Sequence, residues 1–163
     1  MFSADLTQRA QHLLERMRQQ NLRLATAESC TGGLVAGLLT EIAGSSDVFD
    51  CGFVTYSNAA KATLLAIPTT LIATHGAVSE QVARAMAEGA LTRSRANLAI
   101  AVTGLAGPGG GTLEKPVGLV HFGLARTGQP TRHRRCQFGV LSRSDIRRAA
   151  VTEALDLIAS SLD

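Results

Sequence analysis

The sequence is poor in aromatic residues, and this shortage argues against one class of partner. Aromatic residues make up 4% of the chain, Trp is absent and Tyr56 is the only tyrosine. Proteins that bind nucleic acids commonly present a clustered basic face and stack bases on aromatic side chains. The net charge of +3 reflects a mild excess of arginine rather than a polybasic tail. We therefore expect no nucleic-acid partner.

Cysteine is also scarce, which points to a reducing compartment. The three cysteines, Cys30, Cys51 and Cys136, form no CxxC pair. An odd and sparse set of this kind is typical of reduced thiols in the cytoplasm, where we expect this protein to act. The four histidines are scattered and show no HExxH spacing. We expect neither a metal site nor a cofactor.

Long apolar runs are missing as well. No segment approaches the roughly 20 apolar residues that a membrane-spanning helix needs, so we expect no membrane contact. The N-terminus lacks the apolar region of a signal peptide. A hydrophobic content of 45% with 18% charged residues is typical of a folded globular protein. Because 163 residues suffice to bury one core, we expect a single domain over residues 1–163.

The hydrophobic pattern predicts an alternation of helices and strands. Helical spacing is found over residues 6–17, 34–42, 58–66, 68–75, 79–90 and 146–158. Strands are predicted over residues 22–28, 52–56, 98–102, 117–125 and 131–138, the last two as a hairpin. The predicted N-caps are Asn58, Ser79 and Ser142. This order favours a layered α/β domain with a mixed sheet.

The densest group of basic residues is Arg132-His133-Arg134-Arg135, in the second strand of the predicted hairpin. Charged side chains on an edge strand discourage pairing with another sheet. We therefore interpret this group as an exposed edge strand. A site for an anion or a contact between subunits is the alternative.

Lysine is nearly absent, which draws attention to the two positions that have it. Among sixteen basic residues only Lys61 and Lys115 are lysines. Lys61 lies on an apolar segment that follows Tyr56. The pKa of a lysine falls on burial, so that its amine can act as a base, whereas arginine stays charged. A lysine of this kind together with an activated serine forms a serine–lysine hydrolase site.

The candidate serine is Ser29, which lies where a short apolar run turns into a helical pattern. A side chain at such a turn projects from the edge of the sheet where α/β proteins bind ligands. The N–H groups of Cys30 and Thr31 could then stabilise an oxyanion, and Gly32 and Gly33 would let a substrate approach the backbone. The alternative is that Ser29 or Thr31 simply caps the helix.

Two neighbours of Ser29 have open roles. Cys30 is a rival nucleophile, because a helix N-terminus lowers the pKa of a thiol. It could equally be a small buried packing residue. Glu28 could orient Lys61 or accept hydrogen bonds from backbone amides.

A glycine-rich loop over residues 104–111 follows the predicted buried strand. Such loops can hold a phosphate with backbone N–H groups, although this one matches neither GxGxxG nor GxxxxGK[ST]. We assign substrate contacts to Gly104, Ala106 and Gly107; the alternative is a turn-rich connection. Lys115, just beyond the loop, would either pair with an anion or remain solvated.

These residues together resemble the C-terminal domain of the competence/damage-inducible protein A (CinA) family, in its stand-alone nicotinamide mononucleotide deamidase form. Matching motifs occur in family order along nearly the whole chain. They are the stretches at residues 26–33, 42–46, 52–58 with Lys61, 75–79, 104–108 and 115–118.

The resemblance implies a three-layer α/β/α sandwich with a mixed central sheet, and a homo-oligomer. It implies that the substrate is a small nucleotide, nicotinamide mononucleotide, whose carboxamide is hydrolysed to nicotinate mononucleotide and ammonia without a metal. It assigns the nucleophile to Ser29, the general base to Lys61 and an orienting phenol to Tyr56. From the length we expect this chain not to include the N-terminal nucleotide-hydrolysing domain of some family members.

One segment departs from the family pattern. The family usually has a Gly-Asp-Arg triplet before its last helix, and the arginine belongs to the active site. Arg143 is the nearest match here, but Gly-Asp is missing before it and the spacing is one residue longer. We expect Arg143 to contact the substrate. A non-catalytic nucleotide-binding or regulatory module, and a serine–lysine hydrolase of another amide, are the alternative functions.

Overall fold

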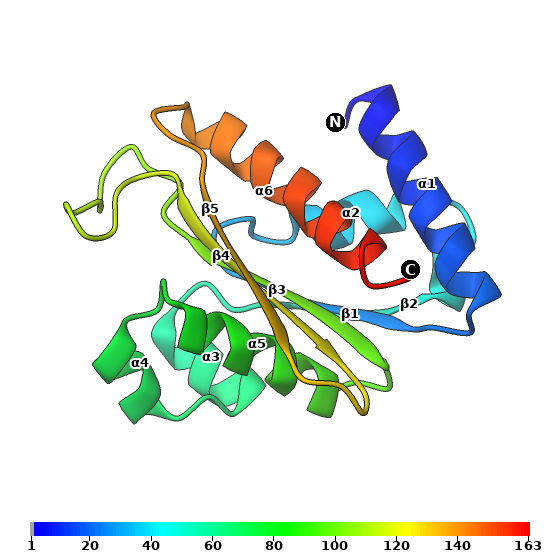
Figure 1. Ribbon diagram of the computed structural model, residues 1–163, viewed down its shortest axis with the longest axis horizontal. Helices are drawn as coiled ribbons and strands as arrows, with labels where there is room; N and C mark the ends of the chain where they lie inside the picture. Colours follow the sequence, from blue (N-terminus) through cyan, green and yellow to red (C-terminus); the bar gives the residue numbers. More distant parts are fainter. Residues whose placement is uncertain (1) are drawn as a thin grey trace.

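A five-stranded mixed sheet forms the centre of the computed structural model, which describes residues 2–163 (Figure 1). The strands in spatial order are β2 (Phe49–Val54), β1 (Leu24–Glu28), β3 (Leu98–Gly104), β4 (Leu119–Arg126) and β5 (Arg132–Gln137). β1 pairs in parallel with both β2 and β3, whereas β4 and β5 join as antiparallel strands. The three parallel strands therefore end at the same edge of the sheet.

Helices cover both faces of this sheet (Figure 1). One face carries α1 (Ala4–Gln19), α2 (Leu34–Thr40) and α6 (Arg143–Ala159). The other carries α3 (Asn58–Leu65), α4 (Thr69–His75) and α5 (Glu80–Thr92). A short 3₁₀ helix, η1 (Ser45–Asp47), leads into β2. The expected three-layer α/β/α sandwich with a mixed sheet is confirmed.

The two faces of the sheet bury side chains of different size. Alternate residues of a strand point to opposite faces. In β3, Leu98, Ile100 and Val102 pack under α1, α2 and α6, while Ala99 and Ala101 belong to the core beneath α5. The small side chains let α5 approach the sheet closely. At Gly123 of β4, an added Cβ would lie 2.7 Å from the carbonyl carbon of Ala83 in α5.

Serine caps fix the start of several helices. Ser79 accepts a hydrogen bond from the N–H of Val82, and Ser142 caps α6, as predicted. The prediction of Asn58 as a cap is wrong by one residue. Ser57 is the N-cap of α3 and accepts from the N–H of Ala60. Ser57 has extended backbone dihedrals, as an N-cap requires, whereas Asn58 is already helical.

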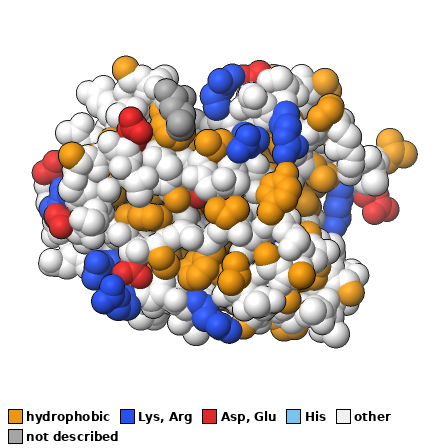
Figure 2. Space-filling model, turned by 180° about the vertical axis from the view of Figure 1, so that it is seen from behind, with side chains coloured by type: hydrophobic (Ala, Val, Ile, Leu, Met, Phe, Trp, Pro, Cys, Tyr) orange, Lys and Arg blue, Asp and Glu red, His pale blue; other side chains and the backbone are white. Residues whose placement is uncertain are grey.

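The basic group Arg132-His133-Arg134-Arg135 lies on β5, and β5 is an edge strand, as predicted. Arg134 pairs with Glu153 of α6, and Arg132 donates to Ser160. On the face that Figure 2 shows, Lys and Arg side chains lie in separate groups rather than on one continuous surface. None of the helices between residues 2 and 163 is both long enough and apolar enough to cross a membrane.

Candidate active site

Three loops meet at the carboxyl edge of the parallel strands. Ser29 follows β1, Tyr56 follows β2, and the glycine-rich loop follows β3. Open α/β sheets bind ligands at this edge. A pocket of about 210 Å³ lies here. Its lining residues are Ser29, Cys30, Tyr56, Gly104, Leu105, Ala106, Gly107, Gly109 and Arg143.

Ser29 and Lys61 are in direct contact. The Oγ of Ser29 lies 3.0 Å from the Nζ of Lys61, within hydrogen-bond distance. The backbone N–H of Ser29 donates to the carbonyl of Val102 at 2.9 Å, which fixes the serine against β3. Lys61 comes from the first turn of α3. Two residues that are 32 positions apart are thus held as a pair by the ends of two neighbouring strands.

Lys61 is buried, and burial controls its chemistry. Its side chain is 1% exposed and its Nζ also donates to the carbonyl of Thr55 at 2.8 Å. Burial lowers the pKa of Lys61, because a charged amine loses its hydration, while the nearby Cys30 thiol opposes the shift. No carboxylate lies within 4 Å of Nζ among the described residues. These surroundings favour a neutral amine that can accept a proton from Ser29.

Glu28 holds the turn that follows Ser29. Its buried carboxylate accepts hydrogen bonds from the N–H groups of Gly33, Val35 and Ala36 at 3.1, 3.0 and 2.9 Å. These amides lie at the start of α2, where the N–H groups have no partner within the helix. The N-cap residue offers no side chain that could accept their hydrogen bonds. Of the two roles considered for Glu28, capping is therefore confirmed.

The idea that Ser29 or Thr31 caps α2 is wrong. The N-cap is Gly33, whose φ of +94° disfavours other residues. Cys30 lines the pocket, whereas the side chain of Thr31 and the two glycines do not, and substrate contacts of Thr31, Gly32 and Gly33 stay a prediction. Gly32 also has a positive φ of +59°. The two glycines are thus needed for the path of the backbone.

Cys30 is a weak rival to Ser29. Its side chain is buried, and burial raises the pKa of the thiol to about 12, with its own backbone N–H opposing. The thiolate is the nucleophilic form of cysteine. At neutral pH Cys30 is therefore a thiol that packs in the core.

Tyr56 and Arg143 meet at the mouth of the pocket. The guanidinium of Arg143 donates to the hydroxyl of Tyr56 at 2.8 Å and to the carbonyl of Gly107 at 2.7 Å. Tyr56 is 62% exposed and makes no hydrogen bond to Lys61 or Ser29, so the expected orienting contact is absent. Arg143 reaches the pocket although Gly-Asp is missing before it. It connects the loops that follow β2 and β3.

The glycine-rich loop provides the remaining wall. Gly104, Ala106 and Gly107 line the pocket together with Leu105 and Gly109, and their contact with a substrate stays a prediction. Lys115 is half-buried and pairs with no carboxylate among the described residues. It donates to the carbonyl of His75 at 2.7 Å and so ties the far end of the loop to α4. The role of this lysine is structural.

Sequence reasoning missed two groups that shape the site. The carbonyl of Thr55 is a backbone group, which no side-chain pattern reveals. Arg147 donates to the carbonyls of Cys30 and Thr31 at 3.1 and 3.0 Å. It lies one helical turn after Arg143 on α6, so the spacing of these two arginines was the signal that could have found it.

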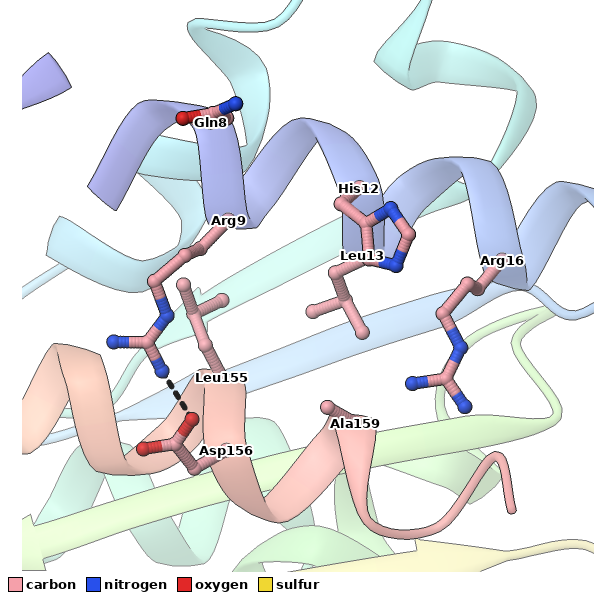
Figure 3. A pocket seen from close by; sticks show the side chains of 8 residues that line it. All are labelled: Gln8, Arg9, His12, Leu13, Arg16, Leu155, Asp156 and Ala159. Atoms are coloured by element: carbon pink, nitrogen blue, oxygen red, sulfur yellow. Dashed lines mark hydrogen bonds and ion pairs between the residues drawn. The ribbon is translucent and has the colours of Figure 1, made fainter. Parts of the chain in front are cut away.

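A second hollow of about 360 Å³ lies between α1 and α6 (Figure 3). It shares no residue with the pocket at Ser29. Arg9 pairs there with Asp156, while Leu13 and Leu155 form an apolar floor. It has no nucleophile paired with a base, so the smaller pocket is the candidate active site despite its size.

The histidines offer no chelating group. The Nδ1 of His121 lies 2.9 Å from the Nε2 of His133, whose other nitrogen faces Glu80 at 3.4 Å. Burial and the neighbouring His133 lower the pKa of His121 to about 4. Within residues 2–163 no three His, Cys, Asp or Glu side chains are placed to hold a metal ion.

A sequence model of the CinA C-terminal domain matches residues 6–162. The chain belongs to this family. A "CinA-like protein" of Anaeromyxobacter sp. (strain Fw109-5) is 49% identical over 150 residues, which are 92% of this chain and 36% of that protein. A "putative competence-damage inducible protein" of Symbiobacterium thermophilum is 60% identical over 113 residues, 69% of this chain and 26% of the relative. The matched part of this chain thus spans about a third or less of the length of these relatives.

Solved structures of CinA proteins match the chain from end to end. The competence/damage inducible protein CihA of Agrobacterium tumefaciens has a TM-score of 0.95 and 50% identity, covering 98% of this chain and 97% of its own. A CinA superfamily protein of Escherichia coli has a TM-score of 0.90 and 33% identity, covering 98% and 92%. The three-layer arrangement is thus the CinA fold.

Proposed function

We propose that this CinA domain hydrolyses the carboxamide of nicotinamide mononucleotide to nicotinate mononucleotide and ammonia, in pyridine-nucleotide salvage. The observation that carries the proposal is the contact of 3.0 Å between Ser29 Oγ and the buried Nζ of Lys61. A serine becomes a nucleophile when an adjacent base removes its proton. A lysine with a lowered pKa provides that base.

In the first half of the reaction, Lys61 takes the proton of Ser29 while Oγ bonds to the carboxamide carbon. The resulting tetrahedral intermediate carries an oxyanion. Lys61, now an ammonium, returns the proton to the amide nitrogen as the C–N bond breaks and ammonia leaves. Ser29 remains bound to the nicotinoyl group as an ester.

In the second half, a water molecule attacks this ester and Lys61 accepts its proton. The C–O bond to Ser29 then breaks and Lys61 returns the proton to Oγ. The acid product ionises at neutral pH. The carbonyl of Thr55 accepts a hydrogen bond from Nζ at 2.8 Å, and both the amine and the ammonium can donate this bond.

The oxyanion needs backbone donors other than Ser29, whose own N–H is bonded to Val102. The N–H groups of Cys30 and Thr31 donate to no backbone carbonyl among the described residues. We assign the oxyanion to these donors. One donor of this kind is worth about 2.7–4 kcal/mol in a comparable enzyme.

The phosphate of the substrate is assigned to the mouth of the pocket. Arg143 lies there and still has donors besides those used for Tyr56 and Gly107. The N–H groups of Ala106 and Gly107 donate to no backbone carbonyl within residues 2–163. A guanidinium and a glycine-rich backbone together suit a phosphate.

The test measures ammonia release from nicotinamide mononucleotide, free nicotinamide and the dinucleotide. The proposal predicts turnover of the mononucleotide, and a KM that rises more for Arg143→Ala than for the control Arg148→Ala, whose arginine pairs with Asp145 outside the pocket. Equal turnover of free nicotinamide would indicate a hydrolase of another amide. Binding of the mononucleotide without ammonia release would indicate a non-catalytic module.

The expected homo-oligomer stays a prediction, which light scattering of the purified chain tests.

A further inference from the structure

Arg147 of α6 contacts the loop that carries the proposed oxyanion donors. Its Nε donates to the carbonyl of Cys30 and its Nη2 to the carbonyl of Thr31. An added Cβ at Gly32 would lie 3.5 Å from Nη2, so the guanidinium rests against the loop. Arg147 pairs with no carboxylate among the described residues, unlike its neighbour Arg148. Its hydrogen bonds are thus directed at this loop.

A trans peptide unit points its C=O and its N–H in opposite directions. When Arg147 holds the carbonyl of Cys30, the N–H of Thr31 in the same peptide unit must point away from Arg147. Arg147 acts on the preceding unit through one further hydrogen bond. It holds the carbonyl of Thr31, the N–H of Gly32 belongs to that same peptide unit, and this N–H donates to the carbonyl of Ser29 at 3.0 Å. The N–H of Cys30 is therefore fixed in direction as well.

Arg147 contacts this loop from outside the pocket. Arg147 lines a separate hollow of about 160 Å³ with Phe2, Leu6 and Leu34. Cys30 lines the pocket at Ser29, whereas Arg147 does not. The guanidinium thus holds the loop from outside the candidate active site, which Ser29 and Cys30 of the same loop line.

We propose that Arg147 is a positioning residue, which aims the N–H groups of Cys30 and Thr31 at the oxyanion by holding the carbonyls of the same loop. This inference rests on the proposed function and deepens it. Hydrogen bonds to a cation also polarise these peptide units and strengthen their N–H groups as donors. A lysine could hold one of the two carbonyls but not both in the geometry of a planar guanidinium.

The experiment compares Arg147→Ala and Arg147→Lys with Arg148→Ala, which removes an arginine from the same helix outside the site. We expect kcat of Arg147→Ala to fall about 10–100-fold, below the full effect of losing an oxyanion donor, because the amides remain but are less well aimed. The KM should change less than about threefold, since the effect belongs to the transition state. Arg147→Lys should recover part of kcat, and guanidinium chloride at low concentration should restore part of the activity of Arg147→Ala alone.

A second readout does not depend on turnover. When Lys61 takes the proton of Ser29, Oγ can bond to the boron of pyridine-3-boronic acid, and the boron becomes a tetrahedral anion that mimics the oxyanion. Calorimetry measures the affinity. The inference predicts weaker binding by Arg147→Ala than by Arg148→Ala. If the wild type turns over no amide but this difference appears, the proposed substrate is wrong and the inference stands.

Three results would overturn the inference. Equal kcat and equal boronate affinity for the Arg147 and Arg148 variants would show that Arg147 does not position the N–H groups of the loop. A loss of activity that follows thermal stability, with no recovery by lysine or guanidinium, would show a purely structural role. Failure of the wild type to bind the boronate would show that no oxyanion site exists here.

Discussion

Glu28→Gln is the substitution with the most definite expected cost. Three N–H groups share the two oxygens of this buried carboxylate: Gly33 and Val35 bond to Oε2, and Ala36 bonds to Oε1. Glutamine replaces one oxygen with an NH₂ group, which cannot accept. The favourable orientation keeps the oxygen toward Gly33 and Val35, so that the N–H of Ala36 faces another donor.

The magnitude follows from these three bonds. A buried donor left without a partner costs about 1–3 kcal/mol, and each of the two surviving bonds loses up to about 1 kcal/mol of charge assistance. The expected loss in the free energy of unfolding is therefore about 1–5 kcal/mol. In a domain of this size each kcal/mol lowers Tm by about 2–4 °C, which gives a decrease of roughly 2–20 °C.

Urea unfolding and thermal scans of Glu28→Gln test this expectation, with Glu41→Gln as the control. Glu41 is exposed and follows α2 instead of preceding it. The control should stay within about 0.5 kcal/mol of the wild type. Because Ser29 adjoins Glu28, activity should fall even where the variant is folded. Equal stability of the two variants would refute the claim that Glu28 holds this turn.

Three other substitutions or treatments follow from the structure. Lys61→Met should reduce kcat at least about 100-fold yet keep or raise the free energy of unfolding at pH 7. The pKa of Lys61 is lowered in the folded state, so wild-type stability increases with pH from that lowered value to the unfolded value of about 10.4. Thermal scans should therefore show a smaller advantage of the variant over the wild type at pH 10 than at pH 7. Gly123→Ala should lower the free energy of unfolding by more than about 2 kcal/mol, since its Cβ would meet the backbone of Ala83. Gly109→Ala should not lower it by this much, because an added Cβ there has nothing within 4 Å. Urea unfolding of both variants measures the difference. Cys30 should react with iodoacetamide more slowly than the half-buried Cys51 and Cys136, and peptide mass spectrometry measures the rate of each. Faster labelling of Cys30 would contradict its burial and its pKa of about 12.

Much of the fold was predictable because the strands and helices carry strong local patterns. The continuous apolar run in β3 and the capping serines Ser79 and Ser142 gave the correct element type and position. The cap of α3 was missed by one residue because Ser57 and Asn58 are both good N-caps. Only the backbone dihedrals distinguish them.

The site was predictable in its side chains and less so in its backbone. Ser29 and Lys61 stand out because of their residue types and because they follow adjacent strands. The partner of Tyr56 was not predictable, since the direction of an exposed phenol depends on where α6 places Arg143. The Thr55 carbonyl and the amides held by Glu28 are groups that every residue has, so their use depends on tertiary structure alone.

The most direct test of the account is ammonia release from nicotinamide mononucleotide by the wild type, Ser29→Ala and Cys30→Ala, each shown to be folded and each assayed with a chelator and no added metal. The account predicts release by the wild type and by Cys30→Ala, and none above background by Ser29→Ala. Full activity of Ser29→Ala together with loss in Cys30→Ala would contradict it and assign the nucleophile to the thiol.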